Sequence, residues 1–221
     1  ARADDAPFIA LAHLSAERGA NTRGAWEALL PGASDDALLR VIEAVIRSEA
    51  CGLHWSRFMV ARDGPGGRPV AAACGLPPPF SLWDMEATAA AAADAVTGTP
   101  VPDFKARFAA LMVVLGAGDP EPEGGVVGPV LVVEAVYTDP EWRRRGLIKA
   151  VISAVVRHGV NSTGCRLVKI SVANNNPGAR AAYERLGFTF LSQGRSEACE
   201  ELVGVDGFTR LSMPREAAAL L

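Results

Sequence analysis

The stretch VVEAVYTDPEWRRRGLIKAVI, residues 132–152, joins two different patterns through three consecutive arginines and a glycine. An apolar run of strand composition precedes the turn, and an apolar stripe at helical spacing follows it. Cations at a helix N-terminus oppose the helix dipole and cost about 0.3–1 kcal/mol each. A helix that starts directly after Arg143, Arg144 and Arg145 therefore suggests that a bound anion offsets this cost.

The residues of the turn suit a phosphate group. The first N–H groups of a helix have no partner within the helix, and Gly146 lets an anion approach the backbone closely. The turn matches neither the P-loop pattern GxxxxGKS/T nor the dinucleotide pattern GxGxxG. Two alternatives remain open, a solvated helix start and a basic patch for nucleic acid. The lack of interleaved aromatic residues and the acidic chain argue against a nucleic-acid partner.

The charges are distributed unevenly along the 221 residues, whose net charge is −3. Residues 143–185 hold nine Lys or Arg and one acid, a balance of +8, which leaves −11 for the rest of the chain. This pattern suggests an anionic ligand for one part and a cationic ligand for another. Hydrophobic residues make up 49% of the chain and charged residues 21%, an ordinary globular balance.

Cysteines and histidines are scattered without any CxxC pair. They are Cys51, Cys74, Cys165, Cys199, His13, His54 and His158. We therefore expect reduced thiols, a cytoplasmic location, and neither a disulfide framework nor a metal site. No apolar run has the length of a membrane span, and the first residues lack the pattern of a secretory signal, so no membrane partner is expected.

The element pattern predicts helices first and an alternation of strands and helices later. Asp4 or Asp5 would cap a helix that carries the stripe Phe8, Leu11 and Leu14 and ends at Gly19, and Ser34 would cap a second helix that runs towards Gly52. Extended segments are expected at 53–61, 68–75, 126–138, 166–173, 188–192 and 207–213, and further helices at 82–96, 104–115, 146–159 and 176–187. Such an alternation predicts an α/β fold with helices packed on a sheet.

A second motif, NNNPGARAAYERLGF, occupies residues 174–188. Asn176 suits a helix cap and Gly187 a helix stop. Ala179 and Tyr183 fall on one helical face, where the small side chain leaves space for a slender ligand. Taken alone, Tyr183 is better explained as the large member of a core stripe.

Together the two motifs resemble those of the GNAT superfamily of acetyl-CoA-dependent N-acetyltransferases. Arg143 and Gly146 match the family's Q/R-x-x-G-x-G/A motif, whereas Ile148 stands where Gly or Ala is usual. The signature N-x-x-A-x-x-x-Y-x-x-x-G-F is matched at Asn176, Ala179, Tyr183, Gly187 and Phe188. The resemblance, clearest over residues 130–191, implies a mixed, mostly antiparallel sheet with helices on both faces. It also implies one domain over 1–221, with a helical insertion at 82–118 and an acetyl-CoA-binding core at 126–191.

The resemblance further implies which residues meet acetyl-CoA. Its pantetheine arm would lie along the strand that contains Val136, Tyr137 and Thr138, and its pyrophosphate against the turn. The residues implied for the turn are Arg143, Arg144, Arg145, Gly146, Leu147 and Ile148, and those for the second helix are Asn176 and Ala179.

For the chemistry, the resemblance implies direct attack of a primary amine on the thioester. Glu134 would be the general base if burial raises its pKa, and Tyr183 would donate a proton to the leaving thiolate. A water relay in place of Glu134, or a Glu134 that is merely solvated or ion-paired, remains open. A non-catalytic acyl-CoA sensor on the same fold is the alternative function.

The acceptor is a small-molecule or peptide amine of unknown identity. The segment that follows the hairpin offers Phe80, Trp83, Asp84 and Glu86 to a cationic acceptor, or simply forms a solvated surface. Dimers are common in the family, so a homodimer is one expected assembly.

Overall fold

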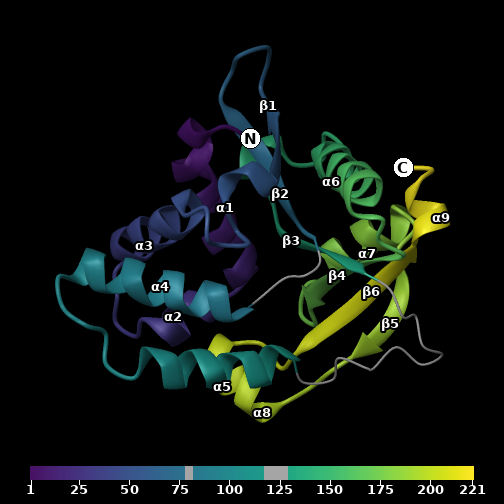
Figure 1. Cartoon of the computed structure of the whole chain (residues 1–221). Coiled ribbons are helices and arrows are strands. Elements are labelled where there is room, and N and C mark those ends of the chain that lie inside the picture. The colour runs from purple at the N-terminus through teal and green to yellow at the C-terminus, as the bar shows by residue number, and fades with distance from the viewer. Residues whose placement is uncertain (78–81, 117–128) are drawn as a thin grey trace.

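The computed structural model of the chain describes residues 1–77, 82–116 and 129–221. Within these residues one sheet has the strand order β1-β2-β3-β4-β6-β5 (Figure 1). Its strands are β1 (Phe58–Arg62), β2 (Pro69–Leu76), β3 (Val130–Thr138), β4 (Leu167–Ala173), β5 (Thr189–Gln193) and β6 (Phe208–Pro214). Neighbouring strands are antiparallel except β3 and β4, which are parallel. The expected mixed, mostly antiparallel sheet is confirmed.

Helices cover both faces of the sheet and enclose two core clusters (Figure 1). Six helices contribute buried side chains to the first cluster: α1 (Ala6–Arg18), α2 (Ala25–Leu29), α3 (Asp35–Arg47), α4 (Leu82–Thr97), α5 (Phe104–Gly116) and α8 (Glu197–Val203). The second cluster contains buried side chains of α6 (Leu147–Thr163), α7 (Pro177–Arg185) and α9 (Arg215–Ala218). Short 3-10 turns are η1 (Ala3–Asp5), η2 (Trp55–Arg57) and η3 (Pro140–Trp142).

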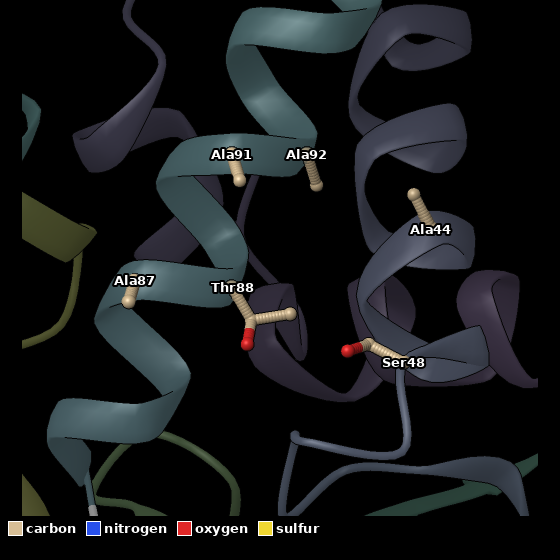
Figure 2. Close-up of a pocket in the computed structure, with 6 residues that line it drawn as sticks. All are labelled: Ala44, Ser48, Ala87, Thr88, Ala91 and Ala92. Atoms are coloured by element: carbon tan, nitrogen blue, oxygen red, sulfur yellow. The ribbon is translucent and has the colours of Figure 1, made fainter.

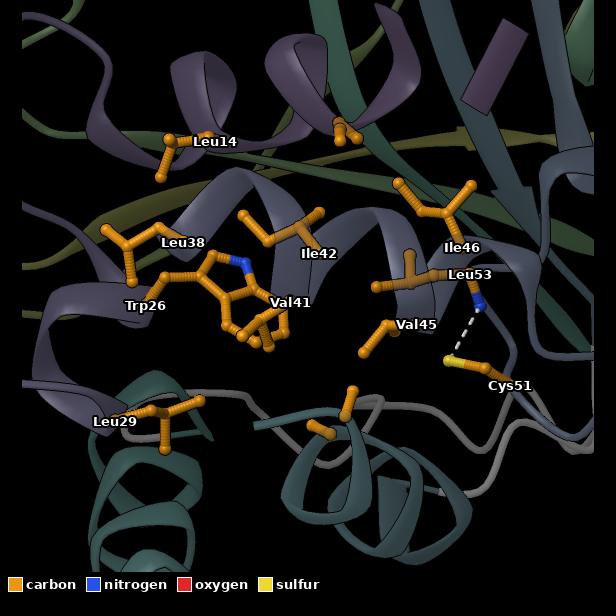
Figure 3. Close-up of a cluster of buried hydrophobic side chains, with 14 of the residues drawn as sticks. Leu14, Trp26, Leu29, Leu38, Val41, Ile42, Val45, Ile46, Cys51 and Leu53 are labelled. Atoms are coloured by element: carbon orange, nitrogen blue, oxygen red, sulfur yellow. Dashed lines mark hydrogen bonds between the residues drawn. The ribbon is translucent and has the colours of Figure 1, made fainter. Parts of the chain in front are cut away.

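Helix α3 anchors the first cluster. As the sequence predicts, the Ser34 side chain caps it by accepting a hydrogen bond of 3.2 Å from the Ala37 amide. The apolar stripe that follows is fully buried, and Figure 3 shows it meeting Trp26 from α2 and Leu14 from α1. Burying one such aliphatic side chain contributes about 1.5–3 kcal/mol.

Two glycines seat α6 closely against the sheet. A Cβ at Gly159 would lie 2.4 Å from a methyl carbon of Leu131 in β3, and one at Gly75 would lie 2.8 Å from Val155. Both distances are shorter than real carbon contacts, so only glycine allows this approach. The close seating fixes the start of α6 beside the end of β3, where the arginine turn connects them.

Three local predictions were wrong in detail. Leu11 is 43% exposed, and the buried face of α1 instead contains Ile9 and His13, because this helix buries small side chains and a histidine. The second helix ends at Arg47, well before Gly52, since Ser48 is already extended. The first extended segment begins with η2, and its strand starts only at Phe58.

Asp5 occupies the predicted cap position of α1 without capping it. Its carboxylate instead accepts hydrogen bonds of 2.8 and 2.7 Å from Arg62 of β1, and Asp5 is 5% exposed. The tertiary ion pair thus replaces the local cap and fixes the start of α1 at the sheet edge.

The structure also bears on the expectations about membrane spans, disulfides and the insertion. In the part that the structure describes, no helix has both the length and the apolar character needed to cross a membrane. The four cysteines, all in described segments, are buried and form no disulfide. The division into an insertion at 82–118 and a core at 126–191 stays a prediction, although α4 and α5 do pack into the first cluster.

Candidate active site

Strands β3 and β4 separate in the middle of the sheet. Their parallel pairing runs from Val130 and Leu167 to Val133 and Ile170 and then ends. Just beyond, Ala135 has a φ of 52°, and the β2–β3 register shifts opposite it. A left-handed alanine costs about 1–3 kcal/mol, and such strain is concentrated at functional sites. The bulge turns β3 away from β4 and leaves the backbone of residues 135–138 without a β4 partner.

The arginine turn lies at the end of β3. Gly146 begins α6 with a φ of 76°, and no side chain caps the helix. Arg143 donates to the Thr138 carbonyl at 3.4 Å, and the Arg145 guanidinium lies 4.4 Å from the centroid of the Trp142 ring. Arg144, with a φ of 62°, is exposed and makes no hydrogen bond or ion pair with a described residue. The turn therefore gathers uncapped amides and cations at one helix N-terminus.

Helix α7 begins as its motif predicts. The Asn176 side chain accepts a hydrogen bond of 3.1 Å from the Ala179 amide, and Pro177 takes the first helical position. Ala179 packs against the second core cluster. Tyr183 is 6% exposed, and its ring centroid lies 6.4 Å from that of Phe188. Its phenol has no hydrogen-bond partner among the described residues.

The structure brings Glu134 and Tyr183 within electrostatic range of each other although they are far apart in sequence. Glu134 is partly buried and forms no hydrogen bond or ion pair with a described residue. Burial raises its pKa to about 8, with a further contribution from the charge of Glu17. Burial also raises the pKa of Tyr183 above its ordinary value, and the Glu134 charge raises it further. A carboxylate that accepts a proton near neutral pH thus acts electrostatically on a phenol that keeps its proton.

Glu17, near the end of α1, is a residue that the sequence did not single out. Burial raises its pKa to about 7, and the charge of Glu27 adds to the effect. Its sequence signal is weak: Glu17 follows Ile9 and His13 at intervals of four, so it extends a buried helical face. A carboxylate on the buried face of α1 indicates a polar site between this helix and the sheet.

Comparison with known proteins is consistent with this geometry. The family model described as "Acetyltransferase (GNAT) family" matches residues 106–188. The aminoglycoside N(6')-acetyltransferase type 1 of Salmonella typhimurium is 35% identical over 60 residues, which are 27% of this chain and 41% of that protein. The enzyme of the same name from Salmonella enteritidis matches equally well. The chain therefore aligns with well under half of the length of these relatives.

Solved structures share the fold over nearly the whole chain. A crystal structure described as an acetyltransferase has a TM-score of 0.64, with 14% identity, and the match covers 97% of this chain and 96% of that one. An N-acetyltransferase from Staphylococcus aureus Mu50 has a TM-score of 0.58 with 14% identity, over 96% and 97% of the two chains. The protein yncA from Salmonella typhimurium, solved with its cofactor acetyl-CoA, has a TM-score of 0.52 with 13% identity, over 97% and 91%. Residues 106–188 thus match the GNAT acetyltransferase family, and nearly the whole chain shares its fold with solved acetyltransferases.

The end of β3 and the arginine turn offer residues that fit acetyl-CoA. Thr138 is 6% exposed, and its hydroxyl has no hydrogen-bond partner among the described residues, so the end of β3 holds an unused polar group beside the turn. The Ile148 side chain, which departs from the family motif, packs against the second core cluster. Packed in this way, it leaves the amides of the first turn of α6 available to a phosphate.

The side chain of Tyr137 packs towards α1. Its ring meets Phe8 of α1 with 6.0 Å between centroids. Glu86, in α4, is partly buried, and one of its carboxylate oxygens has no hydrogen-bond partner among the described residues. Phe80 and the side chains of Trp83 and Asp84 lie outside the described residues.

A depression between α3 and α4 is not part of this site. Figure 2 shows its lining of small side chains, which are Ala44, Ser48, Ala87, Thr88, Ala91 and Ala92. None of them is titratable, so the depression has no group for proton transfer. In the described parts of the chain, no three His, Cys, Asp or Glu side chains gather to form a metal site.

Proposed function

We propose that this chain transfers an acetyl group from acetyl-CoA to a primary amine by direct attack. The observation that carries the proposal is that β3 leaves β4 beyond Val133, next to the arginine turn, and that the charge of Glu134 at this point acts on the Tyr183 phenol. The family match and the acetyltransferase relatives support the same activity. They do not favour the alternative of a non-catalytic acyl-CoA sensor.

The turn residues are proposed to hold the coenzyme. The amides of residues 144–148 and the guanidinium groups of Arg143, Arg144 and Arg145 would bind its pyrophosphate. Backbone groups of Val136, Tyr137 and Thr138 would align the pantetheine arm, with Asn176 and Ala179 on its other side. When bound, acetyl-CoA supplies a thioester carbonyl that an amine can attack.

Two side chains are proposed to move protons. Glu134 accepts a proton from the attacking ammonium group, directly or through one water, and its pKa of about 8 suits this task near neutral pH. Tyr183 donates its phenolic proton to the sulfur of the departing thiolate. Because the pKa of Tyr183 is raised, the phenol keeps its proton until the thiolate of CoA forms.

The acceptor is proposed to be a small cationic amine. The matched Salmonella relatives are named for aminoglycosides, which makes these compounds the first acceptors to test. The excess negative charge outside residues 143–185 and the partly buried Glu134 favour a cation over a neutral or anionic acceptor.

An amine panel tests the proposal through the release of free CoA thiol. The panel contains aminoglycosides, alkylamines, diamines, amino acids and short peptides, and the proteins are the wild type, Tyr183→Phe and Glu134→Gln. We expect turnover with at least one amine and a fall of about 10²–10⁴-fold in kcat for each variant, the usual contribution of a general acid or base. Acetyl-CoA binding without thiol release from any amine would contradict the proposal.

A further inference from the structure

A cavity of about 280 Å³ lies between the second half of α6 and the first strands of the sheet. Helix α6 packs across β1, β2 and β3 (Figure 1), and residues of η2 and of the end of β2 complete the lining of the cavity. A water molecule takes up about 30 Å³ in the liquid, so the cavity has room for about nine atoms or groups of that size. A space of these dimensions suits a small molecule.

This cavity is separate from the candidate active site. At 1.5 Å per helical residue, His158 in its lining lies about 18 Å along α6 from Gly146 of the arginine turn. The two sites also lie on different faces of the sheet. Leu131 of β3 lines the cavity and belongs to the second core cluster, whereas Glu134 is opposite Cys74 of β2, which belongs to the first. Opposite residues of antiparallel strands share a face, so the sheet stands between the cavity and the Glu134 side chain.

The floor of the cavity is apolar and formed in advance. Leu131 and Val155 lie on it, and both are buried in the second core cluster. Gly75 and Gly159 also line it, and each is packed so closely that an added Cβ would overlap with one of these two side chains. Met59 of β1 extends the apolar surface. Because close packing fixes the floor, this surface exists without a ligand, as is usual for small-molecule sites.

The polar side chains of the lining are of two kinds. The hydroxyl groups of Ser162 and Thr163 each donate to a carbonyl oxygen of their own helix at 2.7 Å, and the Ser56 hydroxyl lies 2.8 Å from a histidine ring nitrogen. These three groups have partners within the protein. Arg57 and His158 are exposed at the mouth of the cavity, and neither side chain makes a hydrogen bond or ion pair with a described residue.

The charge at the mouth favours an anion. None of the described residues in the lining is acidic, so no carboxylate of the lining competes for the guanidinium of Arg57. Arginine binds carboxylates and phosphates through two parallel hydrogen bonds. A carboxylate carries a single negative charge, which one arginine balances, whereas a phosphate monoester carries about 1.5–2. One arginine above an apolar floor therefore fits a carboxylate with a hydrocarbon body better than a phosphate.

We propose that this cavity is a second ligand site, which binds a small monocarboxylic acid with an aliphatic body of about four to eight carbons. Arg57 from η2 and His158 from α6 bind the carboxylate, and the aliphatic chain lies on Leu131, Val155 and Met59. The proposal does not depend on the transfer reaction, because none of the residues proposed to bind the coenzyme or to move protons is among the described residues of the lining.

Calorimetry and amide chemical shifts test the site, with CoA present to occupy the arginine turn. Hexanoate is the probe, and hexylamine, hexanol and inorganic phosphate are the comparators. We expect hexanoate to bind with a Kd of about 1 mM or below, and each CH₂ added between butanoate and hexanoate to strengthen binding up to about fourfold. Amide signals of residues 56–59 and 155–163 should shift, and those of residues 143–148 should not. Binding of hexylamine or phosphate as tight as that of hexanoate would overturn the assigned ligand class.

Variants separate the carboxylate contact from the cavity itself. Arg57→Gln should weaken hexanoate binding about tenfold or more, the usual effect of losing a hydrogen bond to a charged group, and Arg57→Lys should lose less because it keeps the charge. Ser162→Trp places a large ring at the mouth and should abolish binding. Arg157→Gln is the matched control, because this exposed cation of α6 bonds to the Leu221 carbonyl and does not line the cavity. It should leave the affinity unchanged.

Melting temperatures show that each variant is folded. The proposal would be overturned by an absence of amide shifts in residues 155–163 at ten times the expected Kd. Equal hexanoate affinities of the wild type and Arg57→Gln would overturn it as well.

Discussion

Replacing Glu134 with glutamine should stabilise the folded protein at alkaline pH although it removes the proposed base. Burial raises the pKa of Glu134 from 4.5 to about 8, and the Glu17 charge contributes. Between these two pH values the folded protein keeps a proton on Glu134, whereas the unfolded chain has lost it. The free energy of unfolding therefore falls as the pH rises through this window, and the stability that is lost is fully present below pH 4.5.

The size of the effect follows from the change in pKa. One pKa unit corresponds to 1.36 kcal/mol, so a change from 4.5 to about 8 is worth about 5 kcal/mol when nothing relaxes. Water entry and side-chain movement reduce this value at a partly buried site, and we expect about 2–5 kcal/mol. Glutamine has nearly the same shape and no charge, so the gain should be present at about pH 9 and absent at about pH 4.

Thermal unfolding of the wild type and Glu134→Gln at several pH values between these limits measures the effect. For a chain of this length, 1 kcal/mol shifts Tm by about 2–4 °C, so a gain of at least about 4 °C is expected at the alkaline end. Glu43→Gln is the matched control, because its carboxylate pairs with Arg47 on the surface and should show no such trend. A Tm difference between Glu134→Gln and the wild type that is the same at every pH would refute the reasoning.

Three further predictions concern the turn, the backbone and the phenol. Arg144→Ala should weaken CoA binding about tenfold or more in calorimetry, whereas Arg40→Ala, which removes a surface cation from α3, should leave affinity unchanged; equal affinities for both variants would exclude a phosphate role. Gly207→Ala should lower the free energy of unfolding by at least about 2 kcal/mol, because its φ is 145° and the new Cβ would lie 2.2 Å from a backbone carbonyl oxygen. The control Gly164→Ala, with a φ of 64° and open space, should cost only about 1 kcal/mol, and a larger loss there than at Gly207 would contradict the strain argument. Tyr183→Phe should lower kcat without changing CoA affinity, and a variant with wild-type thiol release would remove the phenol from the mechanism.

Much of the fold was readable from local patterns. The positions of α4 and α5, the cap at Ser34 and the cap at Asn176 were predicted because each depends on residues that are neighbours in the chain. The mixed, mostly antiparallel sheet was implied by the family resemblance. Predictions failed where a distant partner overrode the local preference. Asp5 stays at its cap position, but its carboxylate pairs with Arg62 of β1 in place of capping the helix, and no local rule contains that contact.

In the candidate site, too, some features are set by adjacent residues and others only by the tertiary structure. The sequence by itself determined the arginine turn and the motif of α7, since a turn, a helix start and a helical stripe are set by adjacent residues. Only the tertiary structure decided that β3 bends at Ala135 and leaves β4, and that the charge of Glu17 in α1 acts on Glu134. Strand order and the packing of a helix across a sheet bring together residues more than a hundred positions apart. The electrostatic environment of a carboxylate depends on those distant neighbours, so it exists only once the chain has folded.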